Sequence, residues 1–351
     1  MTVSHPSGSR GDCDGGREIW LDTVVGPLGF RWVADRLPGE LSPALLYAVV
    51  TVVGTNAATL IYNLSIGADT VYTTNPYYAL EVVLLPAAVV AAQSLHREYD
   101  RAMAEMRVAE RASDPAPLLD LVPEWVPWML FGTAVVTQGI FPGPVDFSDA
   151  TAVFGNFVIL PFIYTPIVVQ LFATYVAIEI LAPIRLWRSD VGIDFLDPEG
   201  VGGLRPIGEL IKKSYYYIAV GLVGYALITY APFIDWGWTV STEANALFTS
   251  IWVLTVAGVA FGVFVLHRFM YREKREEIRR LKRQLRAHIE NPYDVRSYEV
   301  PAEKEAVVAD LRERIRRVSD TSEYPATFSI WSQLLLSIVL PKAIQYVLAG
   351  L

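Results

Sequence analysis

The sequence predicts an all-α membrane protein in which seven transmembrane helices form a bundle. Two observations carry this prediction. Hydrophobic residues make up 53% of the 351 positions and gather in runs long enough to cross a bilayer. The loops between these runs are alternately rich in and free of Lys and Arg, which is typical of helices that cross a membrane one after another.

The first segment, residues 1–41, is expected to lie in the cytoplasm. Residues 1–16 form a polar tail without the apolar core of a signal peptide. The single cysteine, Cys13, can build neither a disulfide nor a cysteine-based metal site. Arg17–Glu40 mixes aromatic and aliphatic residues with charges, which indicates either an amphipathic helix at the membrane surface or a soluble helix packed on the bundle.

Six apolar runs between residues 42 and 267 predict the first six spans. The fourth run is 33 residues long and has no turn signal, so we expect one helix that is kinked at Pro161 and Pro166 and projects beyond the bilayer. The expected spans are Ser42–Leu64, Tyr77–Leu95, Trp125–Phe141, Ala152–Ile184, Ser214–Phe233 and Ala244–His267.

The sixth span is expected to continue into a cytoplasmic helical hairpin over residues 268–323. Apolar residues recur at intervals of three and four in each arm, as on one face of a helix. Two such one-sided helices should pack together, within one chain or between subunits. Acids are interleaved with the bases, so the segment does not predict nucleic-acid binding. The expected seam consists of Ile278, Leu281, Leu285, Ile289, Leu311, Ile315 and Val318.

The last segment, residues 324–351, contains the seventh span, Phe328–Leu348, which carries a polar stripe. Its polar residues recur at multiples of four and therefore follow one side of the helix. A lysine in this span costs about 3 kcal/mol unless it meets water or a partner, so Lys342 either faces a pore or extends to the outer surface. The candidates to line a pore are Ser329, Gln333, Ser337, Lys342 and Gln345.

The distribution of positive charge predicts the orientation. Lys and Arg number four before the first span and four, five and fifteen in the second, fourth and sixth loops, whereas the first, third and fifth loops have none. The positive-inside rule places the amino terminus and the basic loops in the cytoplasm and the carboxyl terminus outside. We therefore expect a multi-pass protein of the plasma membrane in contact with lipid.

No catalytic motif is present. The four histidines are scattered, and neither a metal-binding His pair nor a phosphate-binding or dinucleotide-binding glycine loop occurs. The loop Asp190–Gly203 gathers carboxylates and glycines, but not at the spacing of a calcium loop. We expect no enzyme activity, no metal and no cofactor.

Two acidic residues lie within apolar runs. Glu81 is expected near the outer end of the second span and Glu179 near the inner end of the fourth. Side chains at these depths either reach interfacial water or face the interior of the bundle. In the second case, Glu81 and Glu179 are candidates for an ion pathway.

The chain resembles the seven-helix ion-channel superfamily of insect odorant and gustatory receptors. The shared features are seven spans, a cytoplasmic hairpin before the last helix and a polar stripe on that helix. Thr327-Phe328 and Gln333-Leu334 match the family's carboxyl-terminal Thr-Tyr…Gln-Phe pattern in part. The resemblance implies a tetramer that is anchored by the hairpin region, with the last helix lining the pore. A stimulus- or ligand-gated channel subunit is the function that it implies.

Three other functions remain open at this stage. Pro161, Pro166 and Pro341 interrupt apolar helices, which favours a secondary transporter. The hairpin is also compatible with a membrane anchor that recruits a soluble partner. Lys342 in the seventh span suggests a heliorhodopsin-like photoreceptor, although the third span has no acid to serve as a counterion for a retinal Schiff base.

Overall fold

The computed structural model describes residues 18–39, 41–140, 153–231, 242–289 and 300–324, together with residues 339, 343 and 347. Every regular element in these residues is helical, which confirms the all-α class. The seventh expected span, including all five pore candidates, lies outside the described residues apart from those three isolated positions.

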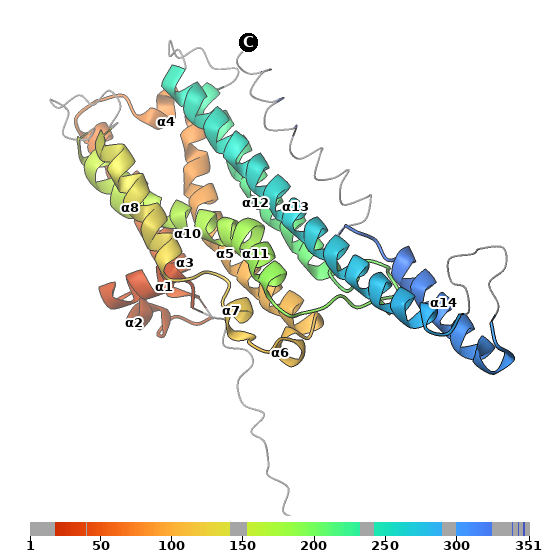
Figure 1. Ribbon diagram of the computed structural model, residues 1–351. Coiled ribbons are helices and arrows are strands. Elements are labelled where there is room, and N and C mark those ends of the chain that lie inside the picture. The colour runs from red at the N-terminus through yellow and green to blue at the C-terminus, as the bar shows by residue number, and fades with distance from the viewer. Residues whose placement is uncertain are drawn as a thin grey trace, which may run out of the picture.

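Long helices run side by side through the bundle, and short ones lie at its ends (Figure 1). The long helices are α3 (Pro43–Ser65), α5 (Ala79–Glu105), α8 (Trp125–Ile140), α12 (Arg205–Tyr230) and α13 (Thr242–Arg286), together with a composite helix formed by η3 (Gly155–Tyr164), α10 (Thr165–Val176), η4 (Ala177–Leu181) and α11 (Ala182–Arg188). The shorter elements are α1 (Trp20–Val25), η1 (Gly26–Leu28), α2 (Phe30–Ala34), α4 (Val71–Thr74), η2 (Pro76–Tyr78), α6 (Val108–Arg111), α7 (Ala116–Leu119), η5 (Ala302–Lys304) and α14 (Glu305–Asp320).

Four helices of the described chain are long and apolar enough to cross a membrane, which supports the expected membrane class. They are Pro43–Ser65, Pro76–Glu105, Gly155–Arg188 and Phe248–Arg286. Two further expected spans are also helical: α8 has 16 residues, and α12 has 26 but begins with charged turns. The count of seven therefore stays a prediction.

The 33-residue apolar run forms a single helix, as expected. Gly155–Arg188 is helical throughout, and its η3 and η4 segments are π-helical. In each of these segments a backbone N–H donates to the carbonyl five residues earlier, Thr165 to Leu160 and Ala182 to Ala177. Pro161 lies inside the first segment, where its missing N–H is accommodated by the wider turn.

This composite helix occupies the centre of the bundle. About two thirds of its apolar stretch is buried (67%), against one third or less for the other three apolar helices. It packs on α5, α8, α12 and α13, so it contacts more of the bundle than any helix at the periphery. Polar side chains on its buried faces are consequently shielded from both lipid and water.

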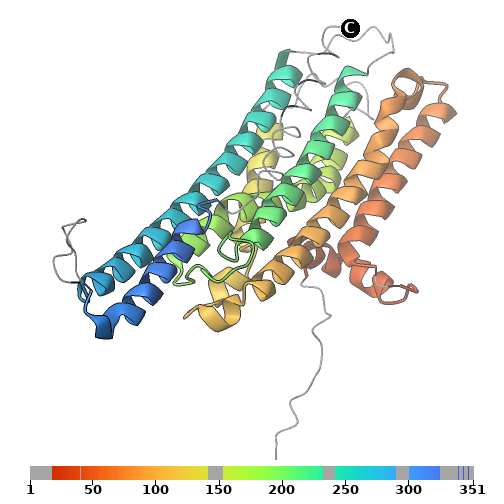
Figure 2. The same ribbon diagram turned by 90° about the vertical axis from the view of Figure 1, so that its right-hand side faces the viewer.

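Basic segments gather at one end of the bundle. Helices α1, α2, α6 and α7 and the α13–α14 hairpin lie at the end opposite α4 (Figures 1 and 2). Contacts between loops join them there: the Arg111 guanidinium donates to the Gly192 carbonyl, and the Ser113 N–H donates to the Asp190 carboxylate at 3.1 Å. The described basic loops thus share one end of the bundle, and the direction of that end relative to a membrane remains a prediction.

The described part of the amino-terminal segment, residues 18–39, packs on the bundle, whereas its position relative to a membrane surface stays a prediction. Leu21 and Val25 of α1 are buried among residues of α3. The Asp22 carboxylate accepts hydrogen bonds from the N–H groups of Ala44, at 2.8 Å, and Ile19, at 3.1 Å. Burial raises the pKa of Asp22, and these two backbone hydrogen bonds act against that rise. Asp22 thus joins α1 to the first turn of α3.

The hairpin is closed by an apolar cluster within one chain. Leu281, Leu311 and Val318 are buried together, and Phe195 from the loop before α12 packs against them. The cluster also includes the partly buried Ile278, Leu285 and Ile315. Ile289, the one remaining residue of the expected seam, is half-buried.

Replacing Leu281 by Asp is expected to open the hairpin. The side chain is 3% exposed, and a charge in this apolar seam should cost about 2 kcal/mol of hairpin stability, a cost limited by the nearness of water. Limited proteolysis in detergent should then cleave residues 268–324 faster than in the unchanged protein. Gln284→Asp, at an exposed position of the same helix, serves as the control. Equal cleavage rates for the two variants would show that the seam does not hold the hairpin together.

Candidate functional site: a buried carboxyl in the bundle

Polar groups are buried along the composite helix at intervals of four or five residues. Thr165, Gln170, Thr174 and Glu179 are each at most 6% exposed. Gln170 is fully engaged: its Oε1 accepts a hydrogen bond from the Leu21 N–H at 3.0 Å, and its Nε2 donates to Thr174 Oγ1 at 3.3 Å. Gln170 therefore fixes α1 to the centre of the bundle, and Glu179 is the one ionisable group in the set.

The Glu179 side chain is completely enclosed, at 0% exposure. It lies in the π-helical segment η4. Its Oε1 accepts a hydrogen bond from the Ser214 hydroxyl of α12, whereas its Oε2 has no hydrogen-bond partner among the described residues. Within that part of the chain no basic side chain pairs with it.

The contacts of Glu179 can accommodate its neutral form. Ser214 Oγ is also within reach of the Ile211 carbonyl, at 2.9 Å, and a hydroxyl has only one hydrogen to donate. If Glu179 is protonated, it can donate to Ser214 Oγ while Ser214 donates to Ile211. If Glu179 is ionised, Ser214 donates to it instead, and a buried charge has no basic partner among the described residues, which costs several kcal/mol.

Two glycines of α13 close the site from the other side. A Cβ at Gly262 would overlap the carbonyl oxygen of Glu179, and one at Gly258 would come within 3.2 Å of the Tyr175 hydroxyl. The Tyr175 hydroxyl itself donates to the Thr255 carbonyl at 2.6 Å. The Gly-x-x-x-Gly pair thus lets α13 approach the backbone of the composite helix directly beside Glu179.

Glu81, the other acid within an apolar run, belongs to a separate polar cluster. It is half-buried in the first turn of α5 and interacts electrostatically with Tyr72 and Tyr164. Asn56 connects these tyrosines, because its Nδ2 donates to the Tyr164 hydroxyl at 2.9 Å and its Oδ1 accepts from the Tyr72 hydroxyl. This cluster lies toward the α4 end of the bundle, so the structure does not bring Glu81 to Glu179.

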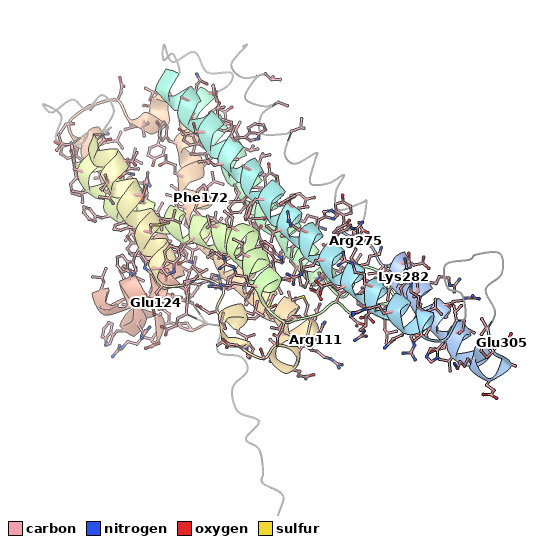
Figure 3. The ribbon with its side chains drawn as sticks, in the orientation of Figure 1. Arg111, Glu124, Phe172, Arg275, Lys282 and Glu305 are labelled. Carbon is pink, nitrogen blue, oxygen red and sulfur yellow. The ribbon has the colours of Figure 1, made fainter. Side chains whose placement is uncertain are left out.

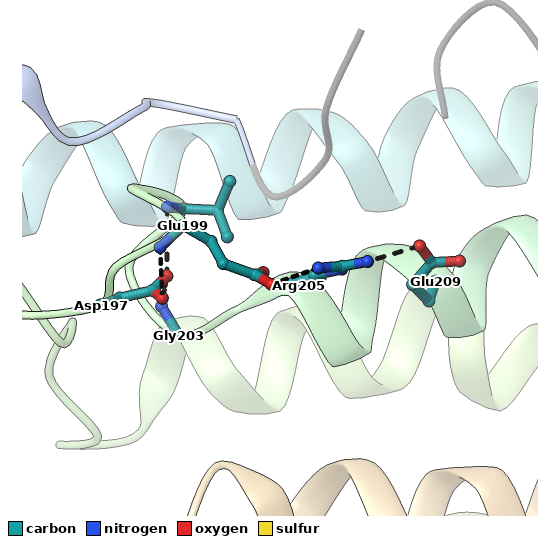
Figure 4. A network of polar contacts seen from close by, with 6 residues as sticks. Asp197, Glu199, Gly203, Arg205 and Glu209 are labelled. Atoms are coloured by element: carbon teal, nitrogen blue, oxygen red, sulfur yellow. Dashed lines mark hydrogen bonds and ion pairs between the residues drawn. The ribbon is translucent and has the colours of Figure 1, made fainter. Parts of the chain in front are cut away.

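The acidic loop before α12 is organised by its own backbone. The Asp197 carboxylate accepts hydrogen bonds from three N–H groups, those of Glu199 (3.0 Å), Val201 (3.1 Å) and Gly203 (2.8 Å) (Figure 4). Glu199 pairs with Arg205, and Gly202 has a φ of +69° with Ile193 where a Cβ would lie. No group of three metal-ligating side chains occurs in the described residues. The Asp197 carboxylate oxygens already accept hydrogen bonds from the backbone of the turn.

Sequence reasoning missed Ser214, the partner of Glu179. The two residues are 35 positions apart on different helices, and a serine at the start of an apolar run gives no signal of its own. The spacing of Gly258 and Gly262 predicts close helix packing, but it does not indicate that an acid lies beside them. The pore candidates Ser329, Gln333, Ser337, Lys342 and Gln345 lie outside the described residues.

Comparisons with known proteins give no relative. The chain matches no protein-family model, and no curated protein or solved structure matches it significantly. Function is therefore inferred from Glu179 and the groups around it.

Proposed function

We propose that this protein moves protons across a membrane and that Glu179 is the group that binds and releases them. One observation carries the proposal: a fully enclosed carboxyl has one oxygen bonded to a serine and the other without a partner in the described chain. Ionisable residues inside membrane bundles are rare because they are costly, and they commonly mark proton relays or ion pathways.

A purely structural carboxyl would be expected to have both oxygens hydrogen-bonded, because an unsatisfied buried polar atom costs about 1–3 kcal/mol. Gln170 illustrates that case on the same helix, since both ends of its amide are used. An oxygen without a partner instead remains free to take up a proton. The π-helical turn that holds Glu179 supports the same conclusion, because such turns are frequent at functional sites.

A groove between α5 and α12 approaches the enclosed site from one side. The groove has a volume of about 410 Å³ and is lined by charged residues that include Glu98 and Lys213, which pair at 2.8 Å. Leu210 also lines it and precedes Ser214 by one helical turn. Water in the groove would thus come within one turn of the Glu179–Ser214 pair along α12.

A gated channel whose last helix lines the pore is the second form of this proposal. In this form, the polar stripe and Lys342 of the expected seventh span would line the pore. A proton transporter is favoured over it by the site, because Glu179 is enclosed on all sides and an enclosed group must be exposed to the two sides alternately. A channel needs a continuous path, whereas a transporter needs only alternating access.

Reconstitution into liposomes tests the proposal. With an imposed pH gradient and a potassium diffusion potential, vesicles that contain the protein should acidify or alkalinise faster than protein-free vesicles, as followed by an enclosed pH-sensitive dye. Flux that saturates with the gradient would support transport, and flux that stays proportional to it would support a channel. Rates equal to those of protein-free vesicles under both gradients would contradict proton movement.

A further inference from the structure

An exposed stripe along α13 changes from apolar to basic within one helical turn. Exposed positions spaced three or four residues apart follow one face of this helix. Leu254 is 71% exposed and Phe264 is 56% exposed, as a surface in contact with lipid tails requires. The apolar part of the stripe is Leu254, Ala257, Phe261 and Phe264, and the basic part is Arg268, Arg272, Arg275 and Arg279.

The change from Phe264 to Arg268 marks where α13 leaves the hydrocarbon. Four residues of helix rise about 6 Å, and the polar headgroup layer on each side of a bilayer is about 5–8 Å deep. Arg268 and Arg272 therefore reach the level of the lipid phosphates when Phe264 lies among the tails. Arg275 and Arg279 continue the same face into the cytoplasmic arm, where Arg275 and Lys282 can be located in Figure 3.

The basic stripe lines a groove rather than a flat surface. The groove has a volume of about 440 Å³, and four arginines face it against a single acid, Glu276. Trp187 of α11 forms its opposite wall, and tryptophan is enriched at the level of lipid headgroups. A second cavity of about 400 Å³ adjoins it and shares Trp187 and Arg272.

The arginines in the groove are only weakly neutralised. Arg272 pairs with Glu273 at 3.0 Å and reaches Glu276 at 4.0 Å. The Arg275 guanidinium lies 4.4 Å above the Tyr271 ring, which leaves its charge in place. Arg268 and Arg279 form no ion pair with the residues that the structure describes. The groove consequently retains positive charge at a height where phosphates occur.

We propose that this groove binds the headgroup of an anionic phospholipid, with Arg268 and Arg272 on the phosphate and Phe264 against the acyl chain. Guanidinium groups recognise phosphate oxygens through two parallel hydrogen bonds, and the apolar stripe directly above supplies the contact that the tails need. A soluble phosphate compound would use the arginines but not the apolar stripe, and this difference favours the lipid. The site would hold the α13 hairpin at a fixed height in the membrane.

Lipid binding to the full chain is measured by native mass spectrometry, with phosphatidylglycerol, phosphatidylcholine and inorganic phosphate as probes. The unchanged protein should retain phosphatidylglycerol and release phosphatidylcholine. Arg268→Gln with Arg272→Gln should weaken phosphatidylglycerol binding about tenfold or more. Arg268→Lys with Arg272→Lys should restore part of it. Lys282→Gln with Arg283→Gln, which removes the same charge farther along the helix, should leave binding nearly unchanged.

Three results would overturn the proposal. Equal retention of the two lipids would mean that charge is not recognised, and equal losses in the two glutamine variants would mean that only net charge matters. Binding of inorganic phosphate, at the concentration at which phosphatidylglycerol binds, would assign the groove to a soluble phosphate compound. Melting temperatures without lipid verify that each variant is folded.

Discussion

Replacing Glu179 by Gln lowers the pH-driven proton flux of the reconstituted protein by about tenfold or more, if Glu179 carries the proton. Glutamine keeps the shape of the side chain and can still accept a hydrogen bond from Ser214 at its carbonyl oxygen. It has no proton to exchange near neutral pH, so the relay is interrupted while the packing is preserved. The measurement is the initial rate of the enclosed dye signal at matched protein content.

Glu124→Gln is the matched control, because it makes the same chemical change at an exposed acid outside the bundle core (Figure 3). Ser214→Ala should give an intermediate rate, since it removes the hydrogen-bond partner of Oε1 but leaves the carboxyl in place. Flux that is unchanged in Glu179→Gln, with a normal melting temperature, would remove Glu179 from the pathway.

Replacing Gly262 by Leu is expected to separate α13 from the composite helix. The position of its Cβ is already occupied by the backbone carbonyl of Glu179, and backbone cannot move aside as a flexible side chain can. Overpacking of this kind costs about 3 kcal/mol or more, and here it also displaces the residue that carries the Glu179 carboxyl. Both the melting temperature in detergent and the proton flux should fall.

Gly221→Leu provides the control for that variant. Gly221 lies on α12, is exposed, and has no atom within 4 Å of the position that a Cβ would take. The same substitution there should be tolerated, because no described atom lies close to the added Cβ. Equal melting temperatures for the two leucine variants would show that the contact between Gly262 and Glu179 is not tight in the membrane.

The elements that could be predicted from sequence are those determined by local composition. The apolar run Ala152–Ile184 predicted one long helix, and the spacing of Leu281, Leu311 and Val318 predicted which faces of the hairpin are apolar. These features depend on periodicity within one segment, and each segment carries its own signal. The membrane class follows from them without any knowledge of packing.

The direction in which Glu179 points could not be predicted in the same way. Two π-helical segments, residues 155–164 and 177–181, interrupt the composite helix. Each changes the number of residues per turn, so the face on which Glu179 lies cannot be calculated from a constant period of 3.6. Its contact with Ser214 and the contact of Gln170 with Leu21, 149 positions away, depend on how separate helices meet.

The central claim is that Glu179 is a neutral, enclosed carboxyl that exchanges its proton, and infrared difference spectroscopy of the membrane-reconstituted protein tests it most directly. A protonated carboxyl has a carbonyl stretch that is well separated from the bands of ionised carboxylates and of amides. The spectrum of the unchanged protein at neutral pH minus that of Glu179→Gln should contain this band, shifted by deuterium exchange and lost on strong alkalinisation. A difference spectrum that shows only carboxylate bands at neutral pH would contradict the claim.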